Sequence, residues 1–503
     1  MEYLAVEGSN KKWFVQVSKL NGKEDLETLD VIRSIVSRRE YKQWAKGFNK
    51  WVEESFFINE TFFPIQFWPD VKKQLAALGY HHELLNEKAL RYELSRADFD
   101  EYIYSIPLPE KYDIVSGEYM YQPDSVYEAI TNKNSRIEIG TSGGKTLITY
   151  LLCRFLIDHK ICDKANKILI VVPTQQLCKQ AQRDFAEYDE FNDEKLIVET
   201  IYSGAMKYLG SDVVIGTYHS LREYDEQYFN DFNVLIIDEA HQGKAYSIRT
   251  GIYNKCCKVE FCFGTTGTWP EYKTLDYLNV VSMFGPLTVV KKAYQLIDDG
   301  NSTPVKIYAL KLKYSDSEDN QLSANLKTAG IIGSEKYRYE KTWFQNNTKR
   351  TKILANLCNK MPGNSLILVD TVAYVEYLQE FLIVNCPTKR IEIIHGGIKD
   401  RTGICLSMET ADGMIIIATY GTMSTGVSIK NLSNIYFPDG GKSPIRIKQS
   451  IGRGMRLFPT KDFCLVFDFQ DMIPFSSFKN HAFFRNKIYR DELFPVQTIE
   501  ITI

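Results

Sequence analysis

The chain has 503 residues, of which 44% are hydrophobic and 25% are charged, and its formal net charge at pH 7 is −2. This length exceeds that of one ordinary hydrophobic core, so two to four domains are expected. The near-neutral charge excludes a uniformly basic nucleic-acid-binding protein, so any such surface must be a local patch. The 10 cysteines include no C-x-x-C pair, which predicts reduced thiols in a cytosol, without a zinc site or a disulfide framework.

The first 110 residues differ in pattern from the rest of the chain and are expected to form a small α+β domain. Residues 13–17 are typical of a strand, 26–37 of a helix, and 71–102 of further helix with a capped start near Ser95. The segment 1–7 lacks the basic and apolar regions of a signal peptide. No apolar run in the chain approaches the length that spans a bilayer, so no membrane partner is expected.

Residues 38–51 combine basic and aromatic side chains at regular spacing. The basic residues recur every four positions and the aromatic residues at three and four, so a helix here would carry a basic face beside an aromatic face. Such a helix could bind nucleic acid, because bases stack on aromatic rings while lysines follow phosphates. Alternatively, the aromatics pack inward and the lysines are only solvated, and Gly47 weakens the helix prediction. The candidate contacts are Arg38, Lys42 and Lys46.

Two α/β domains are expected in tandem after this module. Apolar strand candidates alternate with helical runs, which predicts doubly wound parallel sheets covered by helices on both faces. The polar residues 315–320 are expected to form a loop. The strand candidates are 136–139, 167–172, 213–216, 234–237 and 261–263 in the first domain, and 365–369, 391–394, 414–418 and 464–467 in the second.

A phosphate-binding loop is predicted at residues 140–146, between the strand at 136–139 and a helical run at 147–156. The glycines allow backbone N–H groups to crowd around phosphate oxygens, and the helix N-terminus adds its positive dipole end. Lys145 is expected to reach the β- and γ-phosphates of ATP, and the Thr146 hydroxyl to ligate Mg²⁺. The pattern departs from the standard one at Ile139, where a glycine is usual. The loop residues are Gly140, Thr141, Ser142, Gly143 and Gly144.

Two carboxylates follow the apolar strand at 234–237. Asp238 is expected to hold Mg²⁺, and Glu239 to polarise the water that attacks the γ-phosphate. A D-E pair after a strand is common by chance, and its position downstream of a phosphate loop makes the prediction strong. His241 could link the nucleotide state to the second domain, or it could be a buried, hydrogen-bonded histidine.

A third signal lies at residues 449–456. Arg453 and Arg456 are three positions apart, which places them on one face if the segment is helical. Both could reach the γ-phosphate across an inter-domain cleft as arginine fingers. The alternative is a solvated basic helix end.

Together these residues resemble the motifs of superfamily 2 helicases in the DEAH spelling. The resemblance implies two RecA-like domains that use ATP and Mg²⁺, and this superfamily includes branches that lack the leading glycine replaced here by Ile139. The resemblance also implies that Gln122 pairs with the adenine base, that Gly426 contacts the nucleotide and that Gln449 belongs to the catalytic set. It also assigns Thr266 and Thr268 to the coupling of hydrolysis to strand movement.

The same resemblance assigns nucleic-acid contacts to residues at strand ends. Ser428 replaces the aspartate that is usual in the family, so a carboxylate contact to ribose is not expected. The assigned contacts are Pro173, Thr174 and Thr217 in the first domain, and Thr371, Gly396, Thr419 and Thr425 in the second.

Within the superfamily the chain is similar to the phage UvsW type, on residues 94–101, 283–285, 296–300 and 424–432. This implies DNA-dependent ATP hydrolysis and the unwinding of branched DNA by a monomer that binds single-stranded and branched DNA, with replication or recombination proteins as possible partners. It also implies the cytoplasm of a phage-infected host. The expected division is a nucleic-acid-binding module at 1–110, then RecA-like domains at 111–300 and 301–503. An RNA helicase, an ATP-gated DNA clamp or annealing factor, and the motor of a restriction system remain alternatives.

Overall fold

The structure is a computed structural model that describes the chain except residues 1, 8–12, 19–22, 44–48, 59–61, 81, 86, 113, 116–119, 203–209, 241–244, 273, 329–332 and 424–428. The chain divides into two compact units. The first contains Met1–Ile139 and Gly144–Lys291, and the second contains Gly140–Gly143 and Lys292–Ile503. The predicted boundaries at residues 110 and 300 stay predictions.

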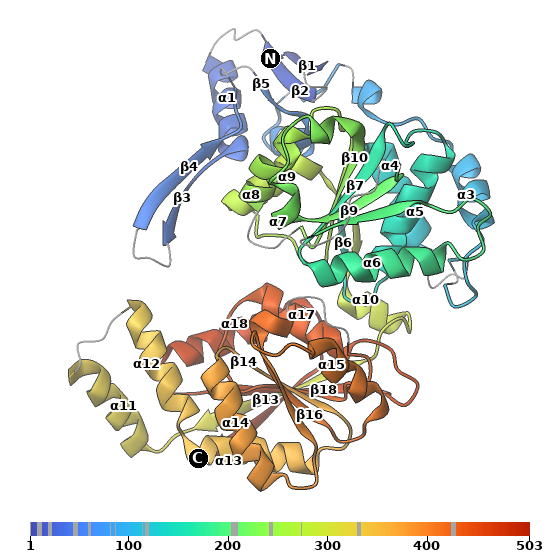
Figure 1. Cartoon of the computed structure of the whole chain (residues 1–503). Helices are drawn as coiled ribbons and strands as arrows, with labels where there is room; N and C mark the ends of the chain where they lie inside the picture. The colour runs from blue at the N-terminus through green and yellow to red at the C-terminus, as the bar shows by residue number, and fades with distance from the viewer. Residues whose placement is uncertain are drawn as a thin grey trace. The chain divides into compact units, whose positions relative to one another are not determined.

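The first unit contains a seven-stranded parallel sheet with strand order β12-β6-β11-β10-β7-β9-β8. Figure 1 labels β6, β7, β9 and β10 of this sheet. Parallel pairing brings the carboxyl ends of all its strands to one edge, where α/β proteins bind their ligands. The strands are β6 (Asn134–Ile139), β7 (Lys167–Val172), β8 (Val198–Ile201), β9 (Val213–Thr217), β10 (Phe232–Asp238), β11 (Phe261–Thr266) and β12 (Leu287–Lys291).

Both faces of this sheet are buried, as its nearly continuous apolar strands predict. In β7, Ile168 and Ile170 belong to one hydrophobic cluster, while Leu169 and Val171 belong to another on the opposite face. The first cluster includes residues of α3, α4, α5 and α6, and the second includes residues of α7, α8 and α9. These helices are α3 (Arg96–Ser105), α4 (Tyr121–Asn132), α5 (Lys145–Asp158), α6 (Gln175–Tyr188), α7 (Tyr218–Leu221), α8 (Ala245–Gly251) and α9 (Leu275–Phe284), with short 3₁₀ turns at η3 (Tyr228–Asp231) and η4 (Tyr253–Lys255).

The second unit repeats this design, which confirms the predicted tandem α/β fold. Its seven parallel strands run in the order β15-β16-β14-β17-β18-β13-β19. The strands are β13 (Val305–Lys313), β14 (Ser365–Val369), β15 (Ile391–Ile394), β16 (Ile415–Thr419), β17 (Asn434–Phe437), β18 (Cys464–Asp471) and β19 (Val496–Thr502). The helices are α10 (Ala293–Asp298), α11 (Asp316–Thr328), α12 (Gly333–Gln345), α13 (Thr348–Lys360), α14 (Val372–Asn385), α15 (Arg401–Thr410), α16 (Tyr420–Met423), α17 (Pro444–Gly454) and α18 (Ser477–Asp491).

The loop expected at residues 315–320 is instead the start of α11. The prediction rested on polarity, but Leu322 and Leu326 give this helix a buried side in a cluster with Phe344 of α12. Because two apolar residues four positions apart share one helical face, a segment that is polar elsewhere can still be helical.

The N-terminal segment is a small α+β unit, as expected. It combines an antiparallel sheet in the order β1-β2-β5 with two helices. Helix was expected throughout residues 71–102, but the helices there are shorter and are separated by irregular chain. The elements are β1 (Glu2–Glu7), β2 (Trp13–Ser18), α1 (Lys23–Val36), β5 (Phe62–Pro64), η1 (Ile65–Phe67), α2 (Trp68–Ala77) and η2 (Glu87–Leu90).

The predicted basic and aromatic helix at 38–51 is wrong. The chain forms an antiparallel hairpin of β3 (Ser37–Gln43) and β4 (Asn49–Ser55), drawn as a long two-stranded arm in Figure 1. Positions four apart share a face in a strand as well as in a helix, so the spacing of the lysines did not distinguish the two structures. Arg38 is exposed and its backbone lies opposite Glu54, and the backbone of Lys42 lies opposite Lys50. Lys46 lies outside the described residues.

A polar contact joins the hairpin to the helices of the first unit. Arg249 of α8 donates to Glu54 of β4 and, at 2.7 Å, to the Asn279 side-chain oxygen of α9. The Asn279 amide donates to the other Glu54 oxygen at 3.0 Å, and the Arg249 guanidinium lies 4.7 Å from the ring centre of Phe56. The Arg249 and Glu54 side chains are only 17% and 16% exposed, so the ion pair is largely desolvated.

We therefore expect Arg249→Met to lower the free energy of unfolding by about 3 kcal/mol, because Glu54 would keep a buried charge without its cation. Denaturant unfolding of the full chain measures this. The double variant Arg249→Met/Glu54→Gln should lose less than the sum of the two single variants. As a control, Arg222→Met removes the exposed pair with Glu223 and should change stability by less than about 0.5 kcal/mol. Equal losses in Arg249→Met and Arg222→Met would contradict the assignment.

Candidate nucleotide and nucleic-acid site

The phosphate-loop sequence forms a tight turn between β6 and α5. The Gly143 N–H donates to the Gly140 carbonyl at 3.1 Å, and Lys145 Nζ folds back to the Ile139 carbonyl at 3.4 Å. Gly144 has φ 75° and Ser142 has φ 72°, both in the left-handed region. A left-handed serine costs on the order of 1–3 kcal/mol, and strain of this kind clusters at ligand sites.

Gln122 lies against this loop from the first turn of α4. Its side chain is buried, with an exposed fraction of 4%. A Cβ atom on Gly144 would displace the Gln122 amide, and the left-handed φ of Gly144 would strain any other residue at this position. The structure thus brings the predicted adenine-reading residue beside the predicted phosphate loop, although 22 positions separate the two in sequence.

The carboxylate of Asp238 lies at the carboxyl end of β10 and is held by the neighbouring strand. Asp238 pairs with Thr265 of β11 in the sheet register, and the Thr265 hydroxyl donates to Asp238 Oδ1 at 2.7 Å. Burial raises the pKa of Asp238, the negative charge of Glu239 raises it further, and Lys145 and Thr265 oppose the rise. Glu239 itself adopts φ 52°. A cation bound here would favour the ionised carboxylate, and the Thr146 hydroxyl in the first turn of α5 is the second oxygen ligand that the sequence predicts.

The residues predicted to couple hydrolysis to movement follow β11. The Thr266 hydroxyl donates to the Thr268 carbonyl and accepts from the Thr268 N–H, both at 3.2 Å. The Ala240 N–H donates to the Thr265 carbonyl at 3.2 Å, so the chain after Asp238 is fastened to this same turn. His241 lies outside the described residues. Thr266 and Thr268 therefore sit one strand away from the carboxylates.

The predicted strand-contact threonines of the first unit are helix caps. The Thr174 hydroxyl accepts from the Leu177 N–H at the start of α6, directly after Pro173. The Thr217 hydroxyl accepts from the Ser220 N–H at the start of α7. Both follow strands of the parallel sheet, β7 and β9, so they lie at the same edge as the phosphate loop. Helix N-termini at this edge offer N–H groups to phosphates.

The second unit presents its candidates at the carboxyl edge of its own sheet. Thr371 precedes α14, and the Gly396 carbonyl accepts from Arg401 at 3.0 Å. The Thr419 hydroxyl, at the end of β16, lies 2.7 Å from the Thr422 hydroxyl. Thr425 and Gly426 lie outside the described residues.

The predicted helix with the two arginines is α17, but it ends earlier than the spacing argument requires. Gln449 and Arg453 lie within α17, whereas Arg456 follows its C-cap Met455. The expectation that Arg453 and Arg456 share one face of a helix is therefore wrong, because Arg456 lies beyond the end of α17. Both guanidinium groups nevertheless act on one neighbour: burial raises the pKa of the Cys405 thiol in α15 to about 12, while the charges of Arg453 and Arg456 oppose this rise.

Sequence reasoning missed Lys461, which fixes the segment that carries Arg456. Lys461 Nζ donates to the carbonyls of Lys430 and Gly454, both at 3.0 Å, and also to that of Arg456. Burial lowers the pKa of Lys461 to about 8. No local pattern reveals this role, because the acceptors are backbone carbonyls, one before α17 and two at or just after its end.

The geometry of the two units defines a class. The first unit combines a doubly wound sheet, a strained phosphate loop after β6 and a half-buried aspartate at the end of β10, two strands away from β6 in the sheet. The second unit adds another doubly wound sheet and an arginine-bearing helix. These are the parts of a superfamily 2 nucleoside triphosphatase. Among the described residues, no group of three or more His, Cys, Asp and Glu side chains could hold a metal ion, and no helix is long and apolar enough to cross a membrane.

Comparisons with known proteins agree with this class. Residues 119–271 match the family described as Type III restriction enzyme, res subunit. The ATP-dependent DNA helicase uvsW of Enterobacteria phage T4 is 30% identical over 420 residues, which cover 80% of this chain and 78% of that protein. The crystal structure of T4 UvsW matches with a TM-score of 0.47 and 23% identity over 100% of both chains. An ATP-dependent Type ISP restriction-modification enzyme, LlaBIII bound to DNA, matches with a TM-score of 0.56 and 15% identity, over 76% of this chain and 31% of that one. This chain belongs to the UvsW family of superfamily 2 helicases, and it is an ATP-dependent helicase.

Asp238→Asn should raise the melting temperature of the nucleotide-free protein at pH 7 by a few degrees while it removes ATPase activity. The raised pKa of Asp238 means that the folded chain binds its proton more tightly than the unfolded chain, so this group costs stability as pH rises above its unfolded pKa. Calorimetry at pH 5 and pH 7 measures the effect, which should be smaller at pH 5. A fall in melting temperature at pH 7 would count against this assignment.

Lys461→Met should lower the ATPase kcat by about tenfold or more and change the nucleotide KM little, because it releases the segment that carries Arg456 without touching the phosphate loop. Since the pKa of Lys461 is lowered to about 8, the unfolded chain binds its proton more tightly between pH 8 and the ordinary lysine pKa. The wild-type free energy of unfolding should therefore rise with pH in this window relative to Lys461→Met. An unchanged kcat would show that Lys461 does not position this segment.

Proposed function

We propose that this protein is an ATP-driven DNA helicase and translocase that remodels branched DNA. Its substrates would be forks and the intermediates of branch migration, recombination and replication restart. The observation that carries the proposal is the half-buried Asp238, whose carboxylate accepts from Thr265 and interacts electrostatically with Lys145 of the phosphate loop. The name of the T4 relative, a DNA helicase, favours DNA as the polymer.

In this proposal four residues of the first unit act on the triphosphate: Lys145, Thr146, Asp238 and Glu239. Lys145 neutralises phosphate charge, Glu239 orients the attacking water, and Thr146 and Asp238 would hold Mg²⁺. Bound Mg²⁺ would neutralise charge that develops on the phosphate oxygens. From the second unit, Gln449, Arg453 and Arg456 complete the catalytic set, with the arginines as fingers. Gln122 reads adenine, and Gly426 also contacts the nucleotide.

The nucleic-acid path follows the strand ends of both units. Contacts from helix caps and backbone N–H groups to phosphates are blind to sequence, so the motor recognises structure and its binding weakens with salt. Three residues couple ATP hydrolysis to movement of the strand along this path: Thr266, Thr268 and His241. The proposed contacts are Pro173, Thr174 and Thr217 on the first unit, and Thr371, Gly396, Thr419 and Thr425 on the second.

The N-terminal module supplies branch recognition in this proposal. Its hairpin carries the exposed Arg38, with Lys42 in the same strand, and the proposed contacts also include Lys46, which lies outside the described residues. The protein acts as a monomer in the cytoplasm of an infected bacterium, alongside replication or recombination proteins. The ion pair between Arg249 of α8 and Glu54 of β4 joins the hairpin to the first unit, so movements of that unit would reach the bound branch through it.

Three alternatives make different predictions about nucleic acid. An RNA helicase would be stimulated by RNA more than by DNA. An ATP-gated clamp or annealing factor would bind DNA without displacing a strand. The motor of a restriction system would need a nuclease in a partner chain, and the LlaBIII likeness shows only a shared fold.

The deciding measurement is the ATPase rate with single-stranded, duplex, forked and four-way DNA, beside matched RNA. We expect the greatest stimulation by forked or four-way DNA, together with strand displacement that requires hydrolysable ATP. Greater stimulation by RNA would favour the first alternative, and binding without displacement would favour the second.

Lys145→Ala and Glu239→Ala should each lower the ATPase kcat by at least about a thousandfold and leave the circular dichroism spectrum unchanged, because each removes a group that acts on the γ-phosphate. The exposed Lys164 and Glu223 provide matched controls, and Lys164→Ala and Glu223→Ala should retain full activity. Undiminished turnover in Lys145→Ala or Glu239→Ala would refute the assigned roles.

A further inference from the structure

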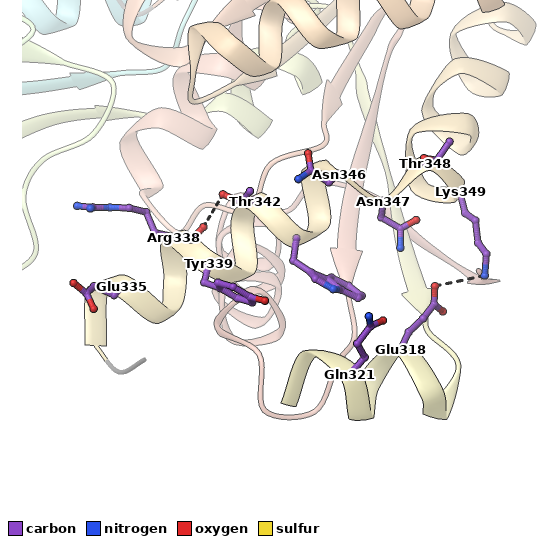
Figure 2. Close-up of a pocket in the computed structure, with 11 residues that line it drawn as sticks. Glu318, Gln321, Glu335, Arg338, Tyr339, Thr342, Asn346, Asn347, Thr348 and Lys349 are labelled. Carbon is purple, nitrogen blue, oxygen red and sulfur yellow. Dashed lines mark hydrogen bonds and ion pairs between the residues drawn. The ribbon is translucent and has the colours of Figure 1, made fainter. Parts of the chain in front are cut away.

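The second unit contains a cavity of about 820 Å³ that the helicase motifs do not use. It lies between α11 and α12 and extends to the start of α13 (Figure 2). In Figure 2, Tyr339 projects from α12 towards the side on which α11 carries Gln321 and Glu318. A cavity of this size accommodates a small planar group with its neighbouring atoms.

One wall of the cavity is aromatic and held in place. Tyr339 and Trp343 are four residues apart, so they share one face of α12. Trp343 packs against Tyr314, with ring centres 5.6 Å apart, and against Phe344, with ring centres 5.2 Å apart. Both wall residues are half-buried against a cluster built around Phe344 and Leu322. A flat ligand would therefore meet rings that are already ordered.

The rest of the lining offers amide groups. Gln321 faces the cavity from α11, and Asn346 and Asn347 lie where α12 gives way to α13. The Asn347 side-chain oxygen caps α13 by accepting from the Arg350 N–H at 3.1 Å, so its amide nitrogen is the group left to meet a ligand. Amides pair with the mixed donors and acceptors along the edge of a heterocyclic base.

The charges around the cavity favour an uncharged occupant. Arg338 and Lys349 contribute two positive charges, and Glu318 and Glu335 two negative charges, so the sum is zero. Lys349 lies 3.5 Å from Glu318, which further neutralises that end. Because these charges cancel, the lining offers a phosphate no net attraction, whereas a base could enter and leave its own phosphate outside, near Arg338, which extends outward in Figure 2.

We propose that this cavity binds one nucleobase of a single strand, stacked on Tyr339 and edged by the amides of Gln321 and Asn346. This inference rests on the proposed function, because it assumes that the motor carries a strand past α12. The ligand class is a neutral, planar heteroaromatic base, without a fixed preference among the four, because every base offers a π-face.

The opposite face of α12 explains how such a pocket would serve the motor. Lys341 Nζ lies 2.7 Å from Asp370, the Tyr337 hydroxyl donates to the Gly440 carbonyl at 2.7 Å, and the Gln345 amide donates to Asp439 at 2.9 Å. Asp370 directly follows β14 and precedes Thr371, one of the proposed strand contacts. The helix that lines the pocket is thus fastened to the edge of the sheet along which the strand is proposed to run.

The test compares the binding of two fluorescent oligonucleotides of equal length to the full chain, one with normal bases and one with abasic sites. The measured quantity is the ratio of the two dissociation constants. Tyr339→Ala should reduce this ratio by about fivefold or more, the loss of one base–aromatic stack, while Tyr339→Phe should keep it. Tyr377→Ala, at a half-buried tyrosine on α14 of the same unit, is the matched control and should leave the ratio unchanged.

A second readout does not depend on altered protein. An oligonucleotide with 5-iodouracil, crosslinked by light to the wild-type chain, should form adducts at Tyr339 or Trp343. An unchanged ratio in Tyr339→Ala, or adducts confined to other segments, overturns the pocket while the proposed function stands, provided that DNA still stimulates the wild-type ATPase. If neither oligonucleotide binds and no nucleic acid stimulates hydrolysis, the proposed function and the pocket both fail.

Discussion

The placement of the half-buried Asp238 carboxylate between adjacent parallel strands is the constraint on which the nucleotide site depends. Its position requires β10 and β11 to be neighbours, because Thr265 supplies the hydroxyl that partly satisfies it. It also requires Lys145 nearby, and that residue comes from the helix that follows β6, on the other side of β11. The strand order therefore creates the site: three segments distant in sequence meet because the sheet is not sequential.

Buried ion pairs do similar work in the second unit. Arg350 of α13 donates to both Asp471 oxygens, at 2.9 and 3.0 Å, and Arg485 of α18 donates to Asp468 at 2.8 Å. Both aspartates belong to β18, so two helices are fixed to one strand through fully desolvated charges. Such pairs add little net stability compared with apolar packing. Separating the two partners is costly, however, because each would be left as an unpaired buried charge. The pairs therefore restrict where the two helices can lie against β18. The same arginines donate to the carbonyls of Pro438 and Gly441, so they also hold the chain between β17 and α17.

The contrast between the phosphate loop and the N-terminal arm shows where sequence reasoning succeeds. The loop was predictable because its geometry is local: glycines, a lysine and a helix start within seven residues determine the turn. The segment at 38–51 was not, since a spacing of four fits one face of a helix and one face of a strand alike. The polar start of α11 was taken for a loop for a related reason, because its two buried leucines lie just beyond the polar run.

By itself, the sequence determined the two apolar sheets, the order of the motifs and the residues placed at strand ends, because strand periodicity and turn chemistry are local properties. Only the tertiary structure decided that Lys461 binds the carbonyls of the arginine segment, that Gln122 fills the space a side chain at Gly144 would need, and that Tyr339 and Trp343 line a cavity. Each of these contacts joins residues that are distant in sequence, or joins a side chain to backbone carbonyls. Backbone carbonyls are the same at every residue, so the sequence does not mark which of them will be bound. Such contacts are selected by strand order and packing, which the chain acquires only when it folds.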